Sequence, residues 1–353
     1  MRALLEGEAV KVGDVYLCGL GVYQPPVHNA GEAARSGLYD RSSYLENRLT
    51  GVCVAGDVSP PEMAVHAARH ALERAALDPA RIGLLMHASV FLQGPEMWLP
   101  AYYVQREVVG SAIPAFEIRL GCNGIFAALE LAAPRMASLP EGETVLVTTA
   151  ENLESPLLDR WNGAPGFLQA DAGSALVLRR EPGFARLLAV ASAAAPELEK
   201  MHRGAEPLFP PGATAGTRID MRERALHFRD TVMPLADAAE LAGKVLTGLV
   251  DQVLGEAGRS LDQMTRVVYA NTAGYYLEQQ VLIPLGIPVE RTTWQYGRGI
   301  GHTGCSDQLL SLNHLLVTGA LAPGDHVLLI GAAPGFTLSG AVLEIREIPA
   351  WAR

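Results

Sequence analysis

The chain has 353 residues, of which 49% are hydrophobic and 19% charged, a balance that is typical of globular proteins and excludes a disordered chain. Its formal net charge of -10 argues against nucleic acid or an anionic membrane surface as a main partner. No uncharged apolar run reaches the ~18 residues of a membrane helix, and residues 1–10 lack the apolar core of a signal peptide. We therefore expect a cytoplasmic protein whose cysteines stay reduced.

Strand and helix signals alternate along the first half of the chain. Ser59 followed by two prolines marks a helix start, and apolar runs bounded by polar turns indicate buried strands. The expected elements are a strand at 15–26, a helix at 59–77, a strand at 81–90, a helix at 97–109, a strand at 115–120, a helix at 122–139 that is kinked or ends near Pro134, and strands at 143–151 and 174–180.

The second half repeats the alternation. We expect an apolar segment at 184–195, a helix near 233–256, a strand at 265–272, a helix at 274–286, a strand at 291–297, a helix at about 305–318 and strands at 326–332 and 339–345. Several of these strands are nearly continuous apolar runs, which favours a parallel-rich sheet covered on both faces and hence a layered α/β fold.

The two halves of the chain resemble each other around one cysteine and one histidine. Gly121 and Cys122 open an apolar helix that leads to a buried strand, and Gly301 and His302 do the same. We interpret this as a duplicated βα unit, with one half at 1–183 carrying Cys122 and the other at 184–353 carrying His302. In such a duplication the two helix starts can meet across a pseudo-twofold axis.

A cysteine beside a histidine is suited to acyl transfer through a thioester. A helix start favours a thiolate, and an imidazole can take its proton or activate an incoming hydroxyl. Asp307, five residues after His302, can hold the imidazole in one tautomer as a third triad member. Each residue also has a structural explanation: a buried cysteine, a turn histidine, and a carboxylate that complements a helix dipole.

Other motifs give weaker signals. Residues 299–304 match G-x-G-x-x-G, but no acidic residue follows at the expected distance, so we reject a dinucleotide site. His66 and His70 lack the glutamate of a zinc motif, and we expect no metal. The loop at 333–340 can supply backbone N–H donors to an oxyanion, or it is an ordinary hairpin connection.

Taken together, these segments resemble the ketoacyl-acyl-carrier-protein synthase III group of the thiolase superfamily over nearly the whole chain. The resemblance implies a five-layered αβαβα fold, a homodimer, and an acyl donor carried on the phosphopantetheine arm of an acyl carrier protein or of coenzyme A, with no permanently bound cofactor. The motifs that carry it are AFEIRLGCNGI at 115–125, ENL at 151–153, DAGSALVL at 171–178, GRGIGHTG at 297–304 and the closing segment 324–345.

The chain departs from the condensing members of this group at the residues that matter for their chemistry. Their catalytic histidine falls at Ala270 or Asn271 here, and their asparagine is replaced by His302. Asn271 can substitute in part for the lost donor. A Cys122, His302 and Asp307 set resembles a divergent branch that transfers acyl groups to hydroxyl or amine acceptors.

Further departures concern the donor and the acyl pocket. Pro334 replaces a glycine that donates its N–H to the acyl oxygen, which leaves Gly335 or the amide of Cys122 as the oxyanion donor. The segment 41–51 lacks the tryptophan that grips coenzyme A in the family, and Arg160 matches the accompanying arginine only loosely; this favours a carrier-protein donor.

Trp98 and Leu99 fall where the family lines its acyl pocket near the dimer interface, although plain core or interface packing explains them as well. The leading hypothesis is acyl transfer from a carrier protein through Cys122 to a small-molecule hydroxyl or amine, as in polyketide or antibiotic biosynthesis. The alternatives are decarboxylative condensation with a malonyl thioester, hydrolysis, and a non-catalytic partner that has kept the fold.

Overall fold

The computed structural model describes residues 12–153, 158–210 and 216–353 of the chain. The expectation that residues 1–10 are not a signal peptide falls outside the described residues. Within the described ranges, no helix is both long and apolar enough to span a membrane.

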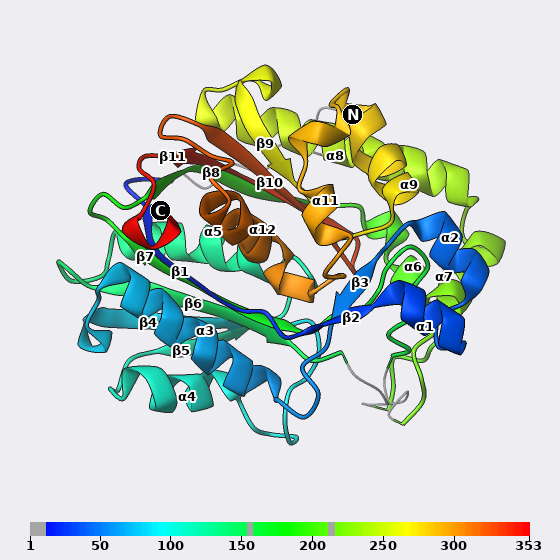
Figure 1. Ribbon diagram of the computed structural model, residues 1–353, viewed down its shortest axis with the longest axis horizontal. Helices are drawn as coiled ribbons and strands as arrows, with labels where there is room; N and C mark the ends of the chain where they lie inside the picture. Colours follow the sequence, from blue (N-terminus) through cyan, green and yellow to red (C-terminus); the bar gives the residue numbers. More distant parts are fainter. Residues whose placement is uncertain (1–11, 154–157, 211–215) are drawn as a thin grey trace.

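Nine strands of the described chain form one hydrogen-bonded sheet (Figure 1). A short pairing between the first and the eighth strand, at Tyr16 with Arg186 and Leu17 with Ala185, joins its two halves. In spatial order the strands are β5 (Ala115–Ile118), β4 (Ile82–Ala88), β6 (Thr144–Glu151), β7 (Ala172–Arg179), β1 (Tyr16–Tyr23), β8 (Ala185–Ala194), β11 (Thr337–Ile345), β10 (His326–Ala333) and β9 (Met264–Val268). A separate ribbon pairs β2 (Val27–Asn29) with β3 (Gly51–Cys53).

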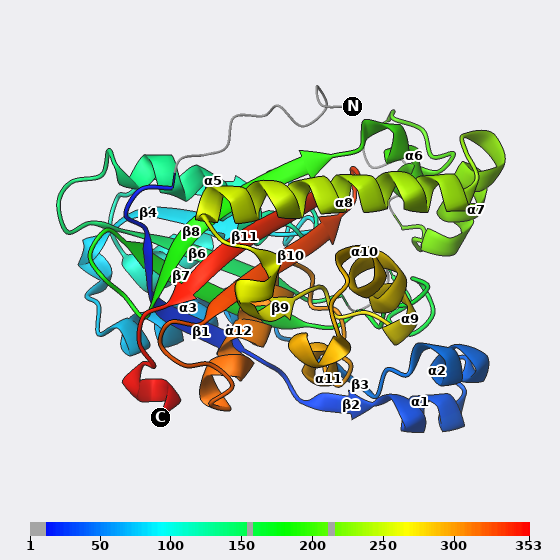
Figure 2. The same cartoon turned by 90° about the horizontal axis from the view of Figure 1, so that it is seen from above.

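Helices lie between the two half-sheets and on their outer faces. The α-helices of the described chain are α1 (Ala30–Ser36), α2 (Arg41–Asn47), α3 (Pro60–Ala75), α4 (Pro100–Val104), α5 (Gly124–Met136), α6 (Lys200–Arg203), α7 (Met221–Thr231), α8 (Leu235–Ala257), α9 (Gly274–Leu277), α10 (Ile283–Leu285), α11 (Trp294–Gly297) and α12 (Asp307–Val317). Figures 1 and 2 show α5 and α12 between the two half-sheets, with α3 and α8 on the outer faces. This is the five-layered αβαβα arrangement of the thiolase fold.

The central layer joins both halves of the chain in one apolar core. Phe126 and Leu129 of α5 belong to the same buried cluster as Leu309 and Leu312 of α12, together with inward-facing side chains of both half-sheets. Separate clusters bury α3 against β1, β4, β6 and β7, and α8 against β8 to β11. The division of the chain between residues 183 and 184 stays a prediction. The shared core contains residues from both sides of this boundary.

Local sequence explains the main helices. Ser59 precedes two prolines that fit the first turn of α3, and its backbone N–H donates to Glu62 Oε2 at 3.0 Å. Helix α5 contains Pro134 and ends two residues later at Met136, close to the end expected from that proline.

Two expectations about the fold are wrong. The sheet is mixed: β4 runs parallel to β5 and β6, and β9 to β10, but the other pairs are antiparallel. Helices bury both faces of the sheet, so its apolar runs report burial and not strand direction. The expected strand at 291–297 contains α11, because Trp294 buries its ring and donates from Nε1 to Thr272 O at 3.0 Å, which outweighs the strand propensity of the segment.

Candidate active site

Cys122 lies between β5 and α5, two residues before the helix begins at Gly124. The helix start is packed tightly against the short turn of helix that precedes α12: a Cβ at Gly124 would come within 2.9 Å of the Cys305 sulfur. The Cys305 Sγ–H donates to Gly121 O at 3.0 Å, and burial raises the pKa of this second thiol, so it stays protonated. Glycine at 124 therefore allows the two helix starts to meet.

His302 lies on the glycine-rich turn that leads through the short helix η8 (Gly304–Ser306) into α12. Its backbone is fixed on both sides: its N–H donates to Leu168 O at 2.8 Å, and its carbonyl accepts from Ala170 N at 2.8 Å. Gly304 has φ +63, and a side chain there would meet the Glu151 side chain at 2.9 Å. The turn thus places the imidazole at one position in the core.

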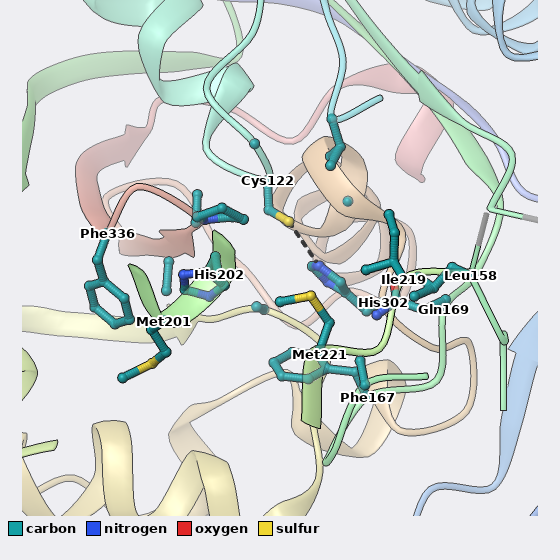
Figure 3. A pocket seen from close by; sticks show the side chains of 18 of the residues that line it. Cys122, Leu158, Phe167, Gln169, Met201, His202, Ile219, Met221, His302 and Phe336 are labelled. Carbon is teal, nitrogen blue, oxygen red and sulfur yellow. Dashed lines mark hydrogen bonds between the residues drawn. The ribbon is translucent and has the colours of Figure 1, made fainter. Parts of the chain in front are cut away.

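The cysteine, the histidine and the aspartate form one hydrogen-bonded chain, of which Figure 3 shows the contact between Cys122 and His302. The Cys122 sulfur is 3.0 Å from His302 Nε2, and His302 Nδ1 donates to Asp307 Oδ2 at 2.6 Å. With Nδ1 donating, Nε2 is left to accept a proton from the thiol or from another group. The juxtaposition expected from the duplicated helix starts is present.

Asp307 is fully buried and accepts hydrogen bonds on both carboxylate oxygens. Oδ1 accepts from Thr303 N and Oγ1, both at 2.7 Å, and from Asn271 Nδ2 at 3.0 Å. Oδ2 accepts from Asn271 N at 2.8 Å as well as from His302. Five donors around one acceptor-only group leave the carboxylate a single orientation, which fixes the imidazole tautomer.

The electrostatic surroundings favour a protonated imidazole at His302. Burial by itself would lower its pKa, but the Asp307 carboxylate and the Cys122 sulfur raise it well above the ordinary value. His302 is therefore a strong proton acceptor when a thiol or hydroxyl lies against Nε2.

A cavity of ≈ 610 Å³ opens onto Cys122 and His302. Apolar and aromatic side chains dominate its wall, which is typical of small-molecule sites. In Figure 3 Leu158 and Ile219 lie on one side of the cysteine and histidine, and Met201, His202 and Phe336 on the other. Phe167 lies against the His302 ring, with 5.2 Å between ring centroids.

Glu151, the first residue of the ENL motif, is buried behind this site. Its Oε1 accepts from Val90 N, and burial raises the pKa of its carboxyl to about 8. At neutral pH it is mainly a neutral acid that holds the loop carrying Val90, a cavity-lining residue.

The position of the family's condensing histidine holds no donor directed at Cys122. Ala270 lines the cavity, whereas Asn271 is buried and its amide group donates to Gly301 O at 2.8 Å and to Asp307. Both amide hydrogens are thus used within the protein. The expectation that Asn271 supports the site therefore takes a different form: it holds Asp307 and has no hydrogen left for a substrate.

The expected oxyanion loop is a tight connection between β10 and β11. Pro334 and Phe336 line the cavity, but Gly335, the expected donor, does not. The Cys122 amide remains the better candidate for an oxyanion donor.

The expected acyl-pocket residues lie away from the cavity of this chain. Trp98 packs against Tyr103, with 6.2 Å between ring centroids, and Leu99 is 49% exposed at the start of α4; neither lines the cavity. Arg160 is buried in a bidentate pair with Asp171, with nitrogen–oxygen distances of 3.0 and 2.9 Å, so its guanidinium is directed into the protein.

Sequence reasoning missed the wall that the segment around α6 and α7 supplies. Met201, His202, Met221 and Arg224 all line the cavity. No motif marks this segment, and only the fold brings it over Cys122. Among the described residues, no group of three or more His, Cys, Asp or Glu side chains is arranged to hold a metal ion.

Comparisons with known proteins agree with this architecture. Residues 116–196 match the family described as 3-oxoacyl-[acyl-carrier-protein (ACP)] synthase III, and residues 254–345 match the C-terminal region of that family. The chain is 23% identical to the β-ketoacyl-[acyl-carrier-protein] synthase III of Clostridium beijerinckii over 94% of this chain and 100% of the relative. It is 27% identical to the synthase III 3 of Streptomyces coelicolor over 88% of this chain and 87% of the relative.

Solved structures extend the comparison. ChlB3, described as an acyltransferase, has 41% identity with a TM-score of 0.90, over 96% of this chain and 100% of ChlB3. The 3-oxoacyl-[acyl-carrier-protein] synthase III of Aquifex aeolicus shares the fold at 22% identity with a TM-score of 0.76, over 94% of this chain and 99% of that one. The chain therefore belongs to the ketoacyl-acyl-carrier-protein synthase III-like family of thiolase-fold acyltransferases.

Proposed function

We propose that the protein takes an acyl group from an acyl carrier protein onto Cys122 and transfers it to a hydroxyl or amine acceptor. The observation that carries this proposal is the hydrogen-bonded chain from the Cys122 sulfur through His302 to the buried Asp307. A cysteine, a base and an orienting carboxylate are the parts that nucleophilic acyl transfer requires.

In the loading step, His302 Nε2 takes the thiol proton and the Cys122 sulfur attacks the carbonyl of the donor thioester. A sulfur–carbon bond forms to Cys122, and the bond to the pantetheine sulfur breaks. The proton on His302 passes to the departing thiolate. We assign the stabilisation of the oxyanion of the tetrahedral intermediate to the Cys122 amide, because Cys122 lines the cavity and Gly335 does not.

In the transfer step, the acceptor hydroxyl takes the place of the pantetheine thiol. His302 removes the hydroxyl proton while the oxygen attacks the acyl carbon. The new ester bond forms, the bond to Cys122 breaks, and the proton returns to the sulfur. Both steps use His302 as the base and need no reactant other than the thioester donor and the acceptor.

Decarboxylative condensation finds less support in the cavity wall. That reaction needs two donors on the malonyl thioester carbonyl to stabilise an enolate. Ala270 offers no donor, and both amide hydrogens of Asn271 are bound within the protein. Acyl transfer to oxygen or nitrogen needs only the base that His302 provides.

The buried position of Arg160 supports a carrier-protein donor over coenzyme A. The Arg160 guanidinium is held by Asp171 in the interior and does not face a nucleotide at the surface. We place the reaction in secondary metabolism, such as polyketide or antibiotic biosynthesis. The 41% identity to ChlB3, which is described as an acyltransferase, supports the acyl-transfer part of this proposal. A cytoplasmic setting suits a nucleophile that must remain a thiol; all four cysteines are unpaired.

A homodimer is also part of the proposal. Strand β5 is an edge of the sheet, and apolar residues are exposed on it and on the adjoining segment: Phe116 at 55%, Leu99 at 49% and Tyr102 at 50%. An exposed edge with apolar neighbours is a template for pairing with a second copy. Because Trp98 and Leu99 do not line the cavity of their own chain, they can contribute to an acyl pocket only across such an interface.

Intact-protein mass spectrometry tests the loading step. Incubation with a panel of acyl carrier proteins should add one acyl mass to the wild type and none to Cys122→Ala. Cys305→Ala serves as the matched control, because it removes the neighbouring buried thiol, and it should still load. Acyl mass on Cys122→Ala would refute the assignment of the nucleophile.

The two steps can be separated at His302. His302→Ala should slow transfer from a preloaded enzyme more than it slows loading, because an acceptor hydroxyl needs a base more than a thiol does. Equal loss of both steps would indicate that His302 mainly activates the sulfur. Release of carbon dioxide from a malonyl donor would favour condensation instead.

A further inference from the structure

One histidine of the cavity wall makes no side-chain hydrogen bond with the described residues. His202 lies in α6 and lines the cavity, with its ring 5.7 Å from that of Phe336 (Figure 3). Its Nδ1 is buried from solvent and makes no hydrogen bond with any described residue. Because Nδ1 is closed off from the cavity as well as from solvent, a ligand can reach the ring only at Nε2. Nε2 makes no hydrogen bond with a described residue and can therefore pair with a polar group of a bound molecule.

The backbone around His202 is held firmly, so the ring has a defined place. Arg224 Nη1 donates to His202 O at 2.8 Å. The same guanidinium donates from Nε and Nη2 to both Glu206 oxygens, at 2.8 and 2.6 Å. Because Glu206 neutralises Arg224, this part of the wall offers no uncompensated positive charge to an anionic ligand.

The charges of the cavity wall also favour a hydroxyl acceptor over an amine acceptor. Burial, with a smaller effect of the Arg224 charge, lowers the pKa of His202 to about 4, so its imidazole is neutral at physiological pH and offers one donor and one acceptor. The described residues that line the cavity include no aspartate or glutamate. An amine that is protonated in solution would have no carboxylate to receive it there, whereas a hydroxyl group needs only the neutral imidazole.

We propose that His202 is a specificity-determining residue that hydrogen-bonds a neutral hydroxyl compound, and that this compound is the acyl acceptor. The inference rests on the proposed function and narrows its acceptor from a hydroxyl or an amine to a hydroxyl. The acceptor lies between His202, which binds one of its polar groups, and His302, which removes the proton of the hydroxyl that reacts.

The test follows the acyl group on and off Cys122 in the full-length protein. Cys122 is loaded from an acyl carrier protein, and its discharge is measured with a methyl glycoside as the hydroxyl probe, with methylamine as the amine probe, and with water alone. The variants are His202→Phe, which keeps a ring against Phe336 but removes both nitrogens, and His202→Asn and His202→Gln, which restore a polar group near Nδ1 or Nε2. His66→Phe makes the same change on the exposed side of α3, against Tyr23.

We expect the glycoside to discharge the wild type faster than water does, and methylamine to add little. His202→Phe should raise the KM for the glycoside roughly 5- to 10-fold, the loss of about one hydrogen bond, while the maximum rate and the loading rate change less than ~3-fold. Either His202→Asn or His202→Gln should recover part of this loss, and His66→Phe should behave as wild type.

Three results would overturn the inference and leave Cys122 chemistry intact: an unchanged KM in a folded His202→Phe variant, faster discharge by methylamine than by the glycoside, or slower loading in His202→Phe, which would assign the ring to the donor arm. Partial recovery in the amide variants guards against a folding defect in His202→Phe. Absence of any acyl mass on wild-type Cys122 would instead refute the proposed function itself.

Discussion

Asp307→Asn isolates the group that orients the proposed base. The carboxylate accepts five hydrogen bonds and donates none: three on Oδ1 from Thr303 and Asn271, and two on Oδ2 from His302 and Asn271. An amide has one acceptor oxygen and one NH₂ group. Its NH₂ group must therefore replace either Oδ1 or Oδ2, and at that position it meets N–H groups that also donate.

The consequence depends on which side the amide nitrogen takes. At the Oδ2 position it would donate to His302 Nδ1, move the imidazole proton to Nε2, and leave no base beside Cys122. At the Oδ1 position it would oppose the N–H of Thr303 and the amide of Asn271. At the Oδ1 position two hydrogen bonds to a charged group are lost outright, about 3–6 kcal/mol of unfolding free energy at about 1.5–3 kcal/mol each; at the Oδ2 position one is lost outright, the bond from the Asn271 N–H, about 1.5–3 kcal/mol.

We expect transfer to fall by about 10³–10⁴, the scale of losing the correct tautomer of a catalytic histidine. The assay is single-turnover transfer from a loaded enzyme, with urea unfolding in parallel. Thr303→Val is the matched control: it removes the hydroxyl bond to Oδ1 at 2.7 Å but keeps the His302 contact, so it should lose stability while transfer stays within about threefold. A folded Asp307→Asn that transfers within tenfold of wild type would refute the orienting role.

Two further predictions concern residues outside the catalytic chain. Burial raises the pKa of Glu151 to about 8, so the native state keeps a proton that the unfolded state releases, and stability should fall as pH rises from about 4.5 to 8. Glu151→Gln cannot titrate and should flatten this slope in urea unfolding between pH 5 and 9; an unchanged slope would show that another group causes it. Phe116→Asp, on the β5 edge, should convert the proposed dimer to monomers in sedimentation equilibrium, whereas Leu208→Asp, also exposed, should not. A monomeric wild type, or a dimer that survives Phe116→Asp, would contradict the edge pairing.

Much of the chemistry could be predicted because it depends on local signals. Cys122 and His302 each follow a glycine and precede an apolar helix, and this matched context predicted their meeting before any coordinates. Helices such as α3 and α8 are long and strongly patterned, so their existence and rough extent followed from periodicity. The substitutions at Ala270 and Asn271 were also visible in the sequence.

Tertiary structure decided what those residues contact. The side chain of Asn271 turns to Asp307 and Gly301, Arg160 turns to Asp171, and Trp98 and Leu99 stay outside the cavity of their own chain. Each outcome depends on contacts between segments far apart in sequence, which local patterns do not encode.

The segment that carries α6 and α7 is the clearest case. Its residues show no chemical motif, and His202 in particular reads as a surface histidine near charged neighbours. Packing over Cys122 turns it into a wall of the cavity with a buried, unpartnered nitrogen. The sequence by itself determined which groups can react, because reactivity belongs to residue types and their immediate context. The assembled layers decided what those groups can bind, because a cavity exists only where distant segments meet.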